Sequence, residues 1–409
     1  MNLREDANYI IKHTIEDNMP DVAVKRAIKE MDIQGDVCLV AIGKAAWQMA
    51  KAAKEVLSDS ITDGVVVTKY DHVKGDLGKI RCYEGGHPVP DINSVKGTKE
   101  AEKLISSLTE DDKVLFLVSG GGSALFEDPE VELEELEDIT KQMLSCGASI
   151  VEMNIIRKRL SKVKGGKFAK MCEPAQVYSI VLSDIIGDPL DMIASGPAYI
   201  DSSTSQQAEE IVKKYNLKLS DKAHEALKKE TPEELTNVIT NISGSVRALC
   251  SSAKAFCEEL GYETEVLTDC LCCEAKDAGS FLASIGKTYK NKGKKAFIAG
   301  GETIVCLKGK GKGGRNQEIA LSAADVIAGF DNVAVFSVGS DGTDGPTDAA
   351  GGYVDGTTKD KLLSQGIEIY DVLENNDAYN ALEKVEGLII TGPTGTNVND
   401  VSVVLIGKE

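Results

Sequence analysis

Short apolar segments alternate with longer segments of helical periodicity along the first part of the chain. Short apolar runs predict strands that are covered on both faces, and their alternation with helices is typical of parallel strands joined by crossover helices. This part of the chain is therefore predicted to form an α/β sheet of mostly parallel strands. The predicted strands are 37–42, 64–68, 113–119 and 177–183. The predicted helices are 45–57 and 133–145.

A polar stretch that contains Pro232 interrupts this alternation and indicates a domain boundary near residue 240. Beyond it, a second set of apolar runs predicts a second sheet, and segments 245–260 and 316–329 predict helices that pack against it. The sequence thus predicts two domains, 1–240 and 241–409. The predicted strands of the second sheet are 264–268, 295–299, 303–308, 333–338, 387–391 and 401–407.

Composition narrows the classes of function. The chain has 409 residues and a formal net charge of −19, which excludes a general nucleic-acid-binding or anionic-membrane-binding surface. No apolar stretch approaches the roughly 20 residues of a membrane-spanning helix, and the N-terminal sequence is too polar for a signal peptide. We expect a cytoplasmic protein that holds anionic ligands by local basic residues.

Ten cysteines are too sparse in a chain of this length for a disulfide scaffold. Cys270, Cys272 and Cys273 crowd together, but no second Cys/His pair follows at a spacing typical of zinc sites. We interpret the cysteines as small apolar residues, not as metal ligands.

Candidate phosphate-binding groups follow the strand predicted at 113–119. They are the backbone and hydroxyl groups of Ser119, Gly120, Gly121, Gly122 and Ser123. Glycines at a strand exit let backbone N–H groups converge on an anion. However, no Lys-Ser or Lys-Thr follows as in a Walker loop, and Leu125 replaces the third glycine of a dinucleotide fingerprint. The cationic partners of the phosphate must therefore come from elsewhere in the chain.

Two other strand ends of the first domain carry charged residues. Lys44 lies between a predicted strand and a predicted helix start, where its ammonium group can assist phosphate binding. Asp184 and Asp188 follow the strand predicted at 177–183. Asp184, nearer to the strand end, is the candidate Mg²⁺ ligand or substrate-orienting residue, whereas a turn or helix-capping role accounts equally well for Asp188.

Segment 154–171 is strongly basic in an otherwise acidic protein. An amphipathic helix whose charges face solvent is the favoured interpretation. The alternative is a basic wall that faces an anionic substrate.

Three loops of the second domain add candidates. Arg315 follows two glycines at a predicted helix start and is placed to hold a carboxylate or a phosphoryl group, and Glu302 follows another glycine pair. Asp341 lies in a glycine-rich acidic loop, for which a cation site competes with turn and cap formation. Asn397 offers a neutral hydrogen-bonding group near a further strand end.

Together these motifs resemble those of the type II glycerate kinases, whose C-terminal portion is called the MOFRL domain. The resemblance covers essentially the whole chain, in the order AIGKAA, GGHPVPD, LVSGGGSALF, RKRLSKVKGGKFA, VLSDIIGDPLDMIASGP, GGETIV, GGRNQE, SDGTDGPTDAAG and TGPTGTNVND. It implies a Rossmann-like, three-layer α/β/α N-terminal domain and a C-terminal MOFRL-type α/β domain with a mixed sheet.

The resemblance also implies a reaction. A kinase of this family transfers the γ-phosphoryl group of ATP to D-glycerate with a divalent cation, here Mg²⁺, and yields 2-phosphoglycerate. Lys44 and Arg315 are the implied active-site residues, approaching the phosphates from the two domains in an interdomain cleft. Arg159 stands where many relatives are expected to have His.

Two other classes of function compete with this interpretation. A hydroxypyruvate reductase acts on a three-carbon acid, but no G-x-G-x-x-G with a following ribose-binding acid is present. A non-catalytic sugar-phosphate sensor would have little need for Lys44, Asp184 and Arg315. The sequence indicates no oligomeric state.

Overall fold

The contacts of the chain divide it into two compact units in the computed structural model, which describes residues 2–408. The N-terminal unit consists of residues Pro20–Ser183 and Asp188–Ser243. The C-terminal unit consists of the chain up to Met19, residues Asp184–Gly187 and the chain from Gly244 onward. Both units are α/β, as predicted. No helix of the described chain is both long and apolar enough to cross a bilayer.

The N-terminal unit is built on a six-stranded sheet with the order β3-β2-β1-β4-β5-β6. Within this order, the neighbouring strands from β3 to β5 pair in parallel, which confirms the predicted arrangement. All six residues of β1 are buried, because helices cover both faces of the sheet. The strands are β1 (Val37–Ile42), β2 (Ile61–Lys69), β3 (Ile80–Gly85), β4 (Lys113–Val118), β5 (Gln176–Leu182) and β6 (Val238–Gly244).

Alternate side chains of this sheet enter two different cores. Leu115 and Leu117 of β4 pack into the cluster that holds the apolar sides of α2 and α3. Phe116, between them, points the other way and stacks with Phe126 and Phe168. The unit therefore has three layers. Its sheet-covering helices and short helices are α2 (Pro20–Glu30), α3 (Ala46–Leu57), α4 (Ile92–Ile105), α5 (Gly122–Leu125), α8 (Lys167–Met171), η1 (Ser58–Ser60) and η2 (Ile193–Ser195).

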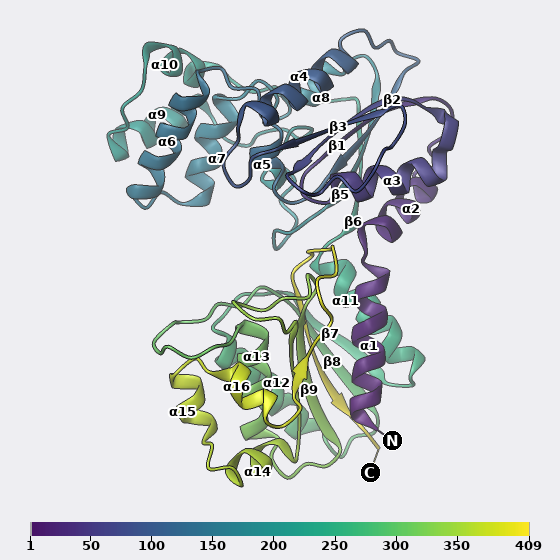
Figure 1. Cartoon of the computed structure of the whole chain (residues 1–409), viewed down its shortest axis with the longest axis vertical. Coiled ribbons are helices and arrows are strands. Elements are labelled where there is room, and N and C mark those ends of the chain that lie inside the picture. The colour runs from purple at the N-terminus through teal and green to yellow at the C-terminus, as the bar shows by residue number, and fades with distance from the viewer. Residues whose placement is uncertain (1, 409) are drawn as a thin grey trace. The chain divides into compact units, whose positions relative to one another are not determined.

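Four further helices of the N-terminal unit form a bundle with its own apolar core (Figure 1). Leu136 and Ile139 of one helix pack there with Ile156 of the next, all three nearly inaccessible to solvent. The bundle extends the unit beyond the edge of a plain three-layer sheet. The helices are α6 (Leu133–Ser145), α7 (Ile150–Arg159), α9 (Ser205–Tyr215) and α10 (Asp221–Lys228).

The C-terminal unit is built on a mixed sheet with the order β11-β10-β9-β12-β8-β7. β12 is antiparallel to both of its neighbours, β8 and β9, whereas β7 and β8 are parallel. The mixed sheet was predicted. The strands are β7 (Glu263–Leu271), β8 (Lys295–Gly301), β9 (Val333–Gly339), β10 (Gly351–Asp355), β11 (Leu388–Ile389) and β12 (Asp400–Ile406).

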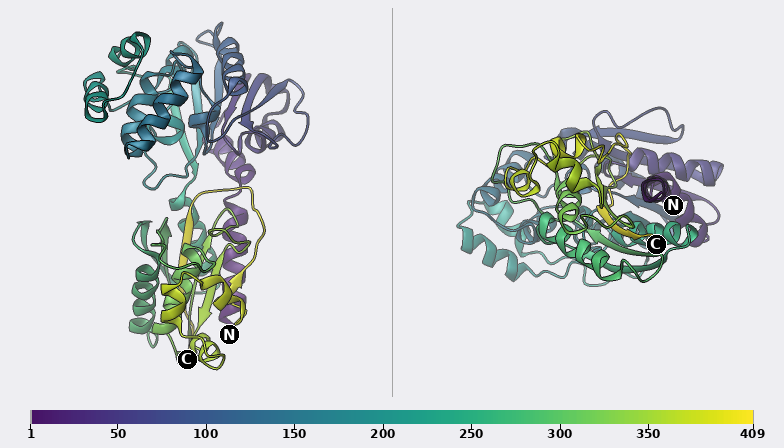
Figure 2. Two further views of the ribbon diagram at one scale, coloured as in Figure 1. Left: turned by 60° about the vertical axis from the view of Figure 1, so that its left-hand side comes forward. Right: turned by 90° about the horizontal axis from the view of Figure 1, so that it is seen from below.

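Helices cover both faces of this second sheet as well. On one face, Ile10, Ile11 and Ile15 of α1 share a core with Leu249 and Phe336. Although α1 is first in the chain, it runs along the C-terminal unit, as the purple helix in Figures 1 and 2 shows. The predicted domains 1–240 and 241–409 assign this helix differently, because its apolar side chains find their partners only in α11 and the second sheet.

The other face of the second sheet packs against α12 and α13. Val333 and Val335 of β9 point to this face, whereas Ala334 and Phe336 point to the α1 side. The helices of the unit are α1 (Leu3–Asp17), α11 (Val246–Glu259), α12 (Ala275–Tyr289), α13 (Arg315–Val326), α14 (Thr358–Leu363), α15 (Ile369–Glu374) and α16 (Ala378–Glu383).

One predicted strand is wrong. Segment 303–308 forms only an isolated bridge, between Ile304 and Glu274. Its Ile304 and Leu307 side chains are exposed, with Leu307 at 82% accessibility. The backbone N–H of Lys308 donates to the Asn376 side chain at 2.8 Å instead of pairing with a strand.

Candidate active site

Two strand-end loops of the N-terminal unit are joined by hydrogen bonds. The Lys44 N–H donates to the Gly120 carbonyl at 2.9 Å, and the Ser119 N–H donates to the Ile42 carbonyl at 3.0 Å. The strands before these loops, β1 and β4, are neighbours at the position where the order of the sheet reverses. In doubly wound sheets, ligands bind beyond the carboxyl ends of the strands at such a reversal.

Close approach explains two of the glycines. A Cβ at Gly43, whose φ is +105°, would lie 2.3 Å from the Ser119 carbonyl oxygen. A Cβ at Gly121, whose φ is +85°, would lie 3.0 Å from the His87 ring and 3.2 Å from Lys44 Cε. Glycine at both positions therefore lets the two loops pack and brings Lys44 and His87 beside the glycine loop, Ser119–Ser123.

The predicted phosphate-binding residues of the glycine loop differ in exposure. Ser119 is buried, and its hydroxyl donates to the Ile42 carbonyl and accepts from the Ala45 N–H, both at 3.1 Å. Ser123 is half-buried, and its hydroxyl is 2.9 Å from that of Ser195. The Ser119 hydroxyl thus fastens the loop, whereas Ser123 lies at a cavity wall.

Lys44 and His87 form a cationic and a neutral group beside the loop. Lys44 is exposed and forms no ion pair within the described chain. Burial and the positive charges of Lys44, Lys69 and His72 lower the pKa of His87 below its ordinary value. His87 is therefore uncharged at neutral pH and able to accept a proton.

A cavity of about 260 Å³ adjoins the glycine loop. Gly121, Ser123 and His87 form one part of its wall, and Glu127 lies in the lining as well. Helices α6 and α7 supply another part of the lining, including Leu136, Leu144 and Arg157. The cavity is thus enclosed by the strand-end loops and the helical bundle of the N-terminal unit.

The favoured interpretation of the basic segment is wrong. Lys158, Arg159 and Lys164 are almost completely buried. Lys158 lies 3.0 Å from Asp201 and also from Asp191, and Arg159 lies 3.2 Å from Asp201. Their partners are distant in sequence, so periodicity within the segment could not reveal them.

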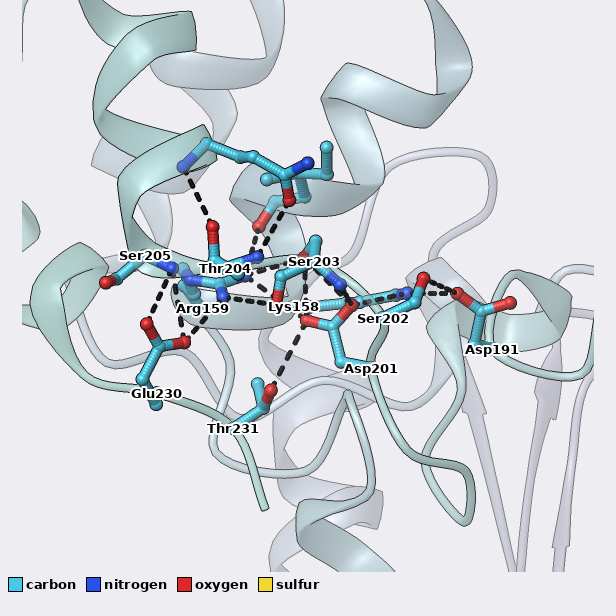
Figure 3. Close-up of polar contacts among 12 residues, drawn as sticks. Lys158, Arg159, Asp191, Asp201, Ser202, Ser203, Thr204, Ser205, Glu230 and Thr231 are labelled. Carbon is cyan, nitrogen blue, oxygen red and sulfur yellow. Dashed lines mark hydrogen bonds and ion pairs between the residues drawn. The ribbon is translucent and has the colours of Figure 1, made fainter. Parts of the chain in front are cut away.

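Figure 3 shows this cluster of ion pairs. Asp201 lies between Lys158 and Arg159, and the Arg159 guanidinium also contacts Glu230 at 3.0 Å. Arg159, expected to be His in many relatives, thus joins α7 to the loop before α9 and to the segment after α10. Its guanidinium is thus occupied by ion pairs that hold these segments together, and a buried ion pair that loses one partner is strongly destabilising.

Asp184 and Asp188 follow β5 but are assigned to different units. Asp184 is half-buried and belongs by its contacts to the C-terminal unit. Asp188 belongs to the N-terminal unit and has a φ of +52°, a left-handed conformation that Asp tolerates in turns. Within residues 2–408 no group of three or more His, Cys, Asp and Glu side chains could form a metal cage.

Arg315, the first residue of α13, is held by two carboxylates of the C-terminal unit. Its Nε and Nη2 donate to the two oxygens of Asp400 at 2.5 and 2.9 Å, and Nη1 lies 3.5 Å from Glu302. Burial lowers the pKa of Arg315, but the hydrogen bond and charge of Asp400 outweigh burial and raise it. Glu318, which follows Arg315 by three residues on α13, is not its partner and instead accepts from Asn376 at 2.9 Å.

Turn and cap formation account for the acidic loop. Asp341 accepts from the Thr343 N–H at 2.9 Å, and Asp344 accepts from the Asn316 and Gln317 N–H groups at the start of α13, at 3.2 and 2.9 Å. Burial raises the pKa of Asp344 to about 7 against the opposing effect of these bonds. Asn397 accepts from the Asn399 N–H at 3.4 Å.

Two residues of the cavity were not singled out from the sequence. Glu127 follows α5 by two residues, and Arg157 lies near the end of α7. A sequence signal existed only for Arg157, which belongs to the basic segment. The structure separates it from the neighbouring Lys158 and Arg159, because it lines the cavity while they turn into the ion-pair cluster.

Comparisons with known proteins cover both units. Residues 6–228 match a domain of unknown function, DUF4147, and residues 295–400 match the MOFRL family. The D-glycerate 2-kinase of Thermotoga maritima is 51% identical over 99% of both chains, and the glycerate 2-kinase of Pyrococcus horikoshii is 41% identical over 100% of this chain and 98% of its own. An Agrobacterium vitis protein provisionally named a hydroxypyruvate reductase is 37% identical over 91% of this chain and 100% of its own.

Solved structures agree with these similarities. The crystal structure of glycerate kinase from Thermotoga maritima superposes with a TM-score of 0.95 at 51% identity, covering 99% of each chain. Both the sequence motifs and the fold of this protein are thus those of the named kinases. The chain belongs to the glycerate 2-kinase family and carries the MOFRL region of that family at residues 295–400.

Proposed function

We propose that this protein transfers the γ-phosphoryl group of ATP to the 2-hydroxyl of D-glycerate and releases 2-phosphoglycerate. The observation that carries the proposal is the placement of Lys44 beside the glycine loop, at the order reversal of the first sheet. Full-length similarity to two named glycerate 2-kinases supports the choice of substrate.

Phosphoryl transfer depends on positioning and on neutralising charge more than on covalent catalysis by the protein. Backbone N–H groups of Gly120, Gly121 and Gly122 would bind phosphate oxygens. The positive charge of Lys44 would stabilise the transition state of phosphoryl transfer more strongly than the bound substrates. His87 is uncharged and adjoins both Lys44 and the cavity. It would accept the proton of the attacking hydroxyl.

Mg²⁺ fits this proposal as an ion bound chiefly to ATP. Nucleotide-bound Mg²⁺ takes most ligands from phosphates and water, so one or two protein carboxylates suffice. Asp184, just beyond β5, would supply such a carboxylate. When bound, the ion would neutralise charge on the transferring phosphoryl group.

The proposal also includes the C-terminal unit, with Arg315 contacting the transferring phosphoryl group. Asp188, Glu302, Asp341 and Asn397 are proposed contributors of lesser weight. Asp341 and Asn397 accept hydrogen bonds typical of turns, and Glu302 pairs with Arg315, so each of the four needs its own kinetic test.

A single preparation distinguishes the competing functions. ADP release that depends on D-glycerate supports the kinase, whereas NADH oxidation with hydroxypyruvate and no ADP release would support a reductase. Binding of phosphorylated acids with neither activity would support a sensor. Product supplied to enolase without a mutase should yield phosphoenolpyruvate, and failure there would indicate the 3-phosphate.

A further inference from the structure

The cavity beside the glycine loop contains one cation and one anion whose bonding is incomplete. Arg157 has no ion pair or hydrogen-bonding partner among residues 2–408, although it is half-buried. The lysine of the lining, Lys141, is exposed and pairs with Glu137 at 3.6 Å. Arg157 is therefore the permanently charged cation of the cavity lining that can pair with an anionic ligand.

Burial lowers the pKa of Arg157, and the charge of Glu127 opposes that effect. An arginine stays protonated in proteins nonetheless. A guanidinium group that is partly removed from water without a partner is unfavourable, and an anionic ligand would relieve this cost by accepting two parallel hydrogen bonds.

Glu127 is the complementary group. It is 2% exposed, and its Oε2 forms an ion pair with the buried Lys164. Its Oε1 has no hydrogen-bond donor within the described chain although it is buried. Since buried polar atoms are nearly always satisfied, this oxygen is suited to accept a hydrogen bond from a ligand hydroxyl.

Cavity size restricts the ligand. Its volume of about 260 Å³ lies below the ~300–1,000 Å³ typical of drug-sized ligand sites, so it suits a small metabolite better than a whole nucleotide. Leu136, Leu144 and Ala124 make much of the remaining lining apolar. The cavity thus offers one guanidinium, one carboxylate oxygen and an apolar surround.

We propose that this cavity is the hydroxy-acid subsite, in which Arg157 binds the substrate carboxylate and Glu127 Oε1 accepts a hydrogen bond from a substrate hydroxyl. The inference rests on the proposed function and deepens it. It assigns the carboxylate to Arg157 and not to Arg315, whose guanidinium already forms two hydrogen bonds with Asp400. Gly121 and Ser123 line the same cavity, so the bound acid lies next to the glycine loop.

The first test measures D-glycerate binding by calorimetry without nucleotide, and steady-state kinetics with ATP and glycerate varied separately. Arg157→Ala should weaken glycerate binding and raise its KM by roughly 10- to 100-fold, the value of a charge-assisted hydrogen bond. KM for ATP should change less than about twofold, and Arg157→Lys should restore part of the loss because lysine keeps the charge without the fork.

Lys170→Ala is the matched control. It removes one positive charge from the same basic segment, but Lys170 is exposed and pairs with Glu173 outside the cavity. Equal glycerate affinity in Arg157→Ala and Lys170→Ala would overturn the subsite. A different outcome would reject the proposed function and retain the subsite: the wild type binds glycerate more tightly than Arg157→Ala does, but shows no kinase activity.

A second test addresses Glu127 through the ligand. Propionate carries a carboxylate but no hydroxyl, so Glu127→Gln should weaken D-glycerate binding severalfold and leave propionate binding unchanged. A loss that is equal for both ligands would reject the hydroxyl contact and indicate a general effect of the unpaired Lys164. Thermal unfolding of both variants establishes that the folded fractions are comparable.

Discussion

Arg315 donates to both carboxylate oxygens of Asp400, and Asp400 is almost completely buried. This relationship joins the first residue of α13 to the first residue of β12, the strand that lies between β8 and β9. The proposed catalytic arginine is therefore also part of the packing of the second sheet.

Arg315→Ala is expected to destabilise the protein by about 2–3 kcal/mol, because it leaves the Asp400 carboxylate buried without its cation. The loss is smaller than for a fully buried pair because Arg315 itself is partly exposed. Urea unfolding should show that the double variant Arg315→Ala/Asp400→Ala loses less than the sum of the two single losses. Additive losses would show that the two side chains are not coupled.

The kinetic role of Arg315 is separable from this effect. If it contacts the transferring phosphoryl group, Arg315→Lys should lower kcat by about tenfold or more, because lysine lacks the planar fork. KM for glycerate should stay near the wild-type value. An increase confined to that KM would place the carboxylate contact on Arg315 and contradict the subsite around Arg157.

Lys44→Ala should lower kcat by about 100-fold or more while the melting temperature stays nearly constant, because an exposed cation without an ion pair contributes little to folding but much to phosphoryl transfer. Lys51→Ala is its control. Lys51 lies on α3, the helix that follows Lys44 in the chain, and pairs with Glu55 at 3.2 Å. Normal turnover in Lys44→Ala would remove this residue from the mechanism.

Asp201 is expected to be a main determinant of stability in the N-terminal unit. Asp201→Asn leaves Lys158 and Arg159 buried with too little negative charge, so we expect a loss of about 3–5 kcal/mol in the free energy of unfolding. Glu225→Gln, which removes the exposed pair with Lys228, should leave the free energy of unfolding nearly unchanged.

The pH dependence of Asp201 has a definite sign. Burial raises the pKa of its carboxyl, but the hydrogen bond from the Ser203 N–H and the charge of Lys158 lower it by more than burial raises it. The pKa of Asp201 is therefore below its ordinary value. Its stabilising contribution is present above the pKa of the unfolded chain, about 4, and is lost as pH falls through the folded value. Denaturant midpoints between pH 6 and 3 should fall more in the wild type than in Asp201→Asn.

Asp344 should show the opposite dependence. Its folded pKa is about 7, above the unfolded value, so its favourable contribution is full below about pH 4 and is lost as pH rises to about 7. Asp344→Asn keeps an acceptor for the α13 N–H groups and is expected to flatten the decline in stability across this range. Parallel curves of denaturation midpoint against pH would contradict the raised pKa.

Local pattern predicted much of the framework. The buried strands Val37–Ile42 and Lys113–Val118 were predicted from the sequence because all their residues except Lys113 are apolar. β3 (Ile80–Gly85) and β10 (Gly351–Asp355) were not predicted, since one is half-exposed and the other begins with two glycines. Segment 303–308 is apolar enough for a strand, but its Lys308 N–H and Cys306 carbonyl bond to the Asn376 side chain.

The candidate site was predictable only where it lies at strand ends. Lys44 and the glycine loop follow directly from the positions of β1 and β4, so their proximity could be expected from the sheet. Arg157 and Glu127 come from a helix end and a loop, and nothing local distinguishes Arg157 from the buried Arg159 two residues later. That difference is set by partners such as Asp201 and Glu230, which are far away in sequence.

The position of α1 and β12 affects how the protein folds during synthesis. The ribosome makes α1 before either sheet, but its apolar side contacts Leu249 and Phe336 only after those residues have emerged. β12, which joins β8 to β9, is completed still later, at Ile406. The residues of the N-terminal unit are complete at Ser243, so this unit can fold while translation continues, whereas Ile10, Ile11 and Ile15 of α1 stay uncovered until the second sheet has emerged.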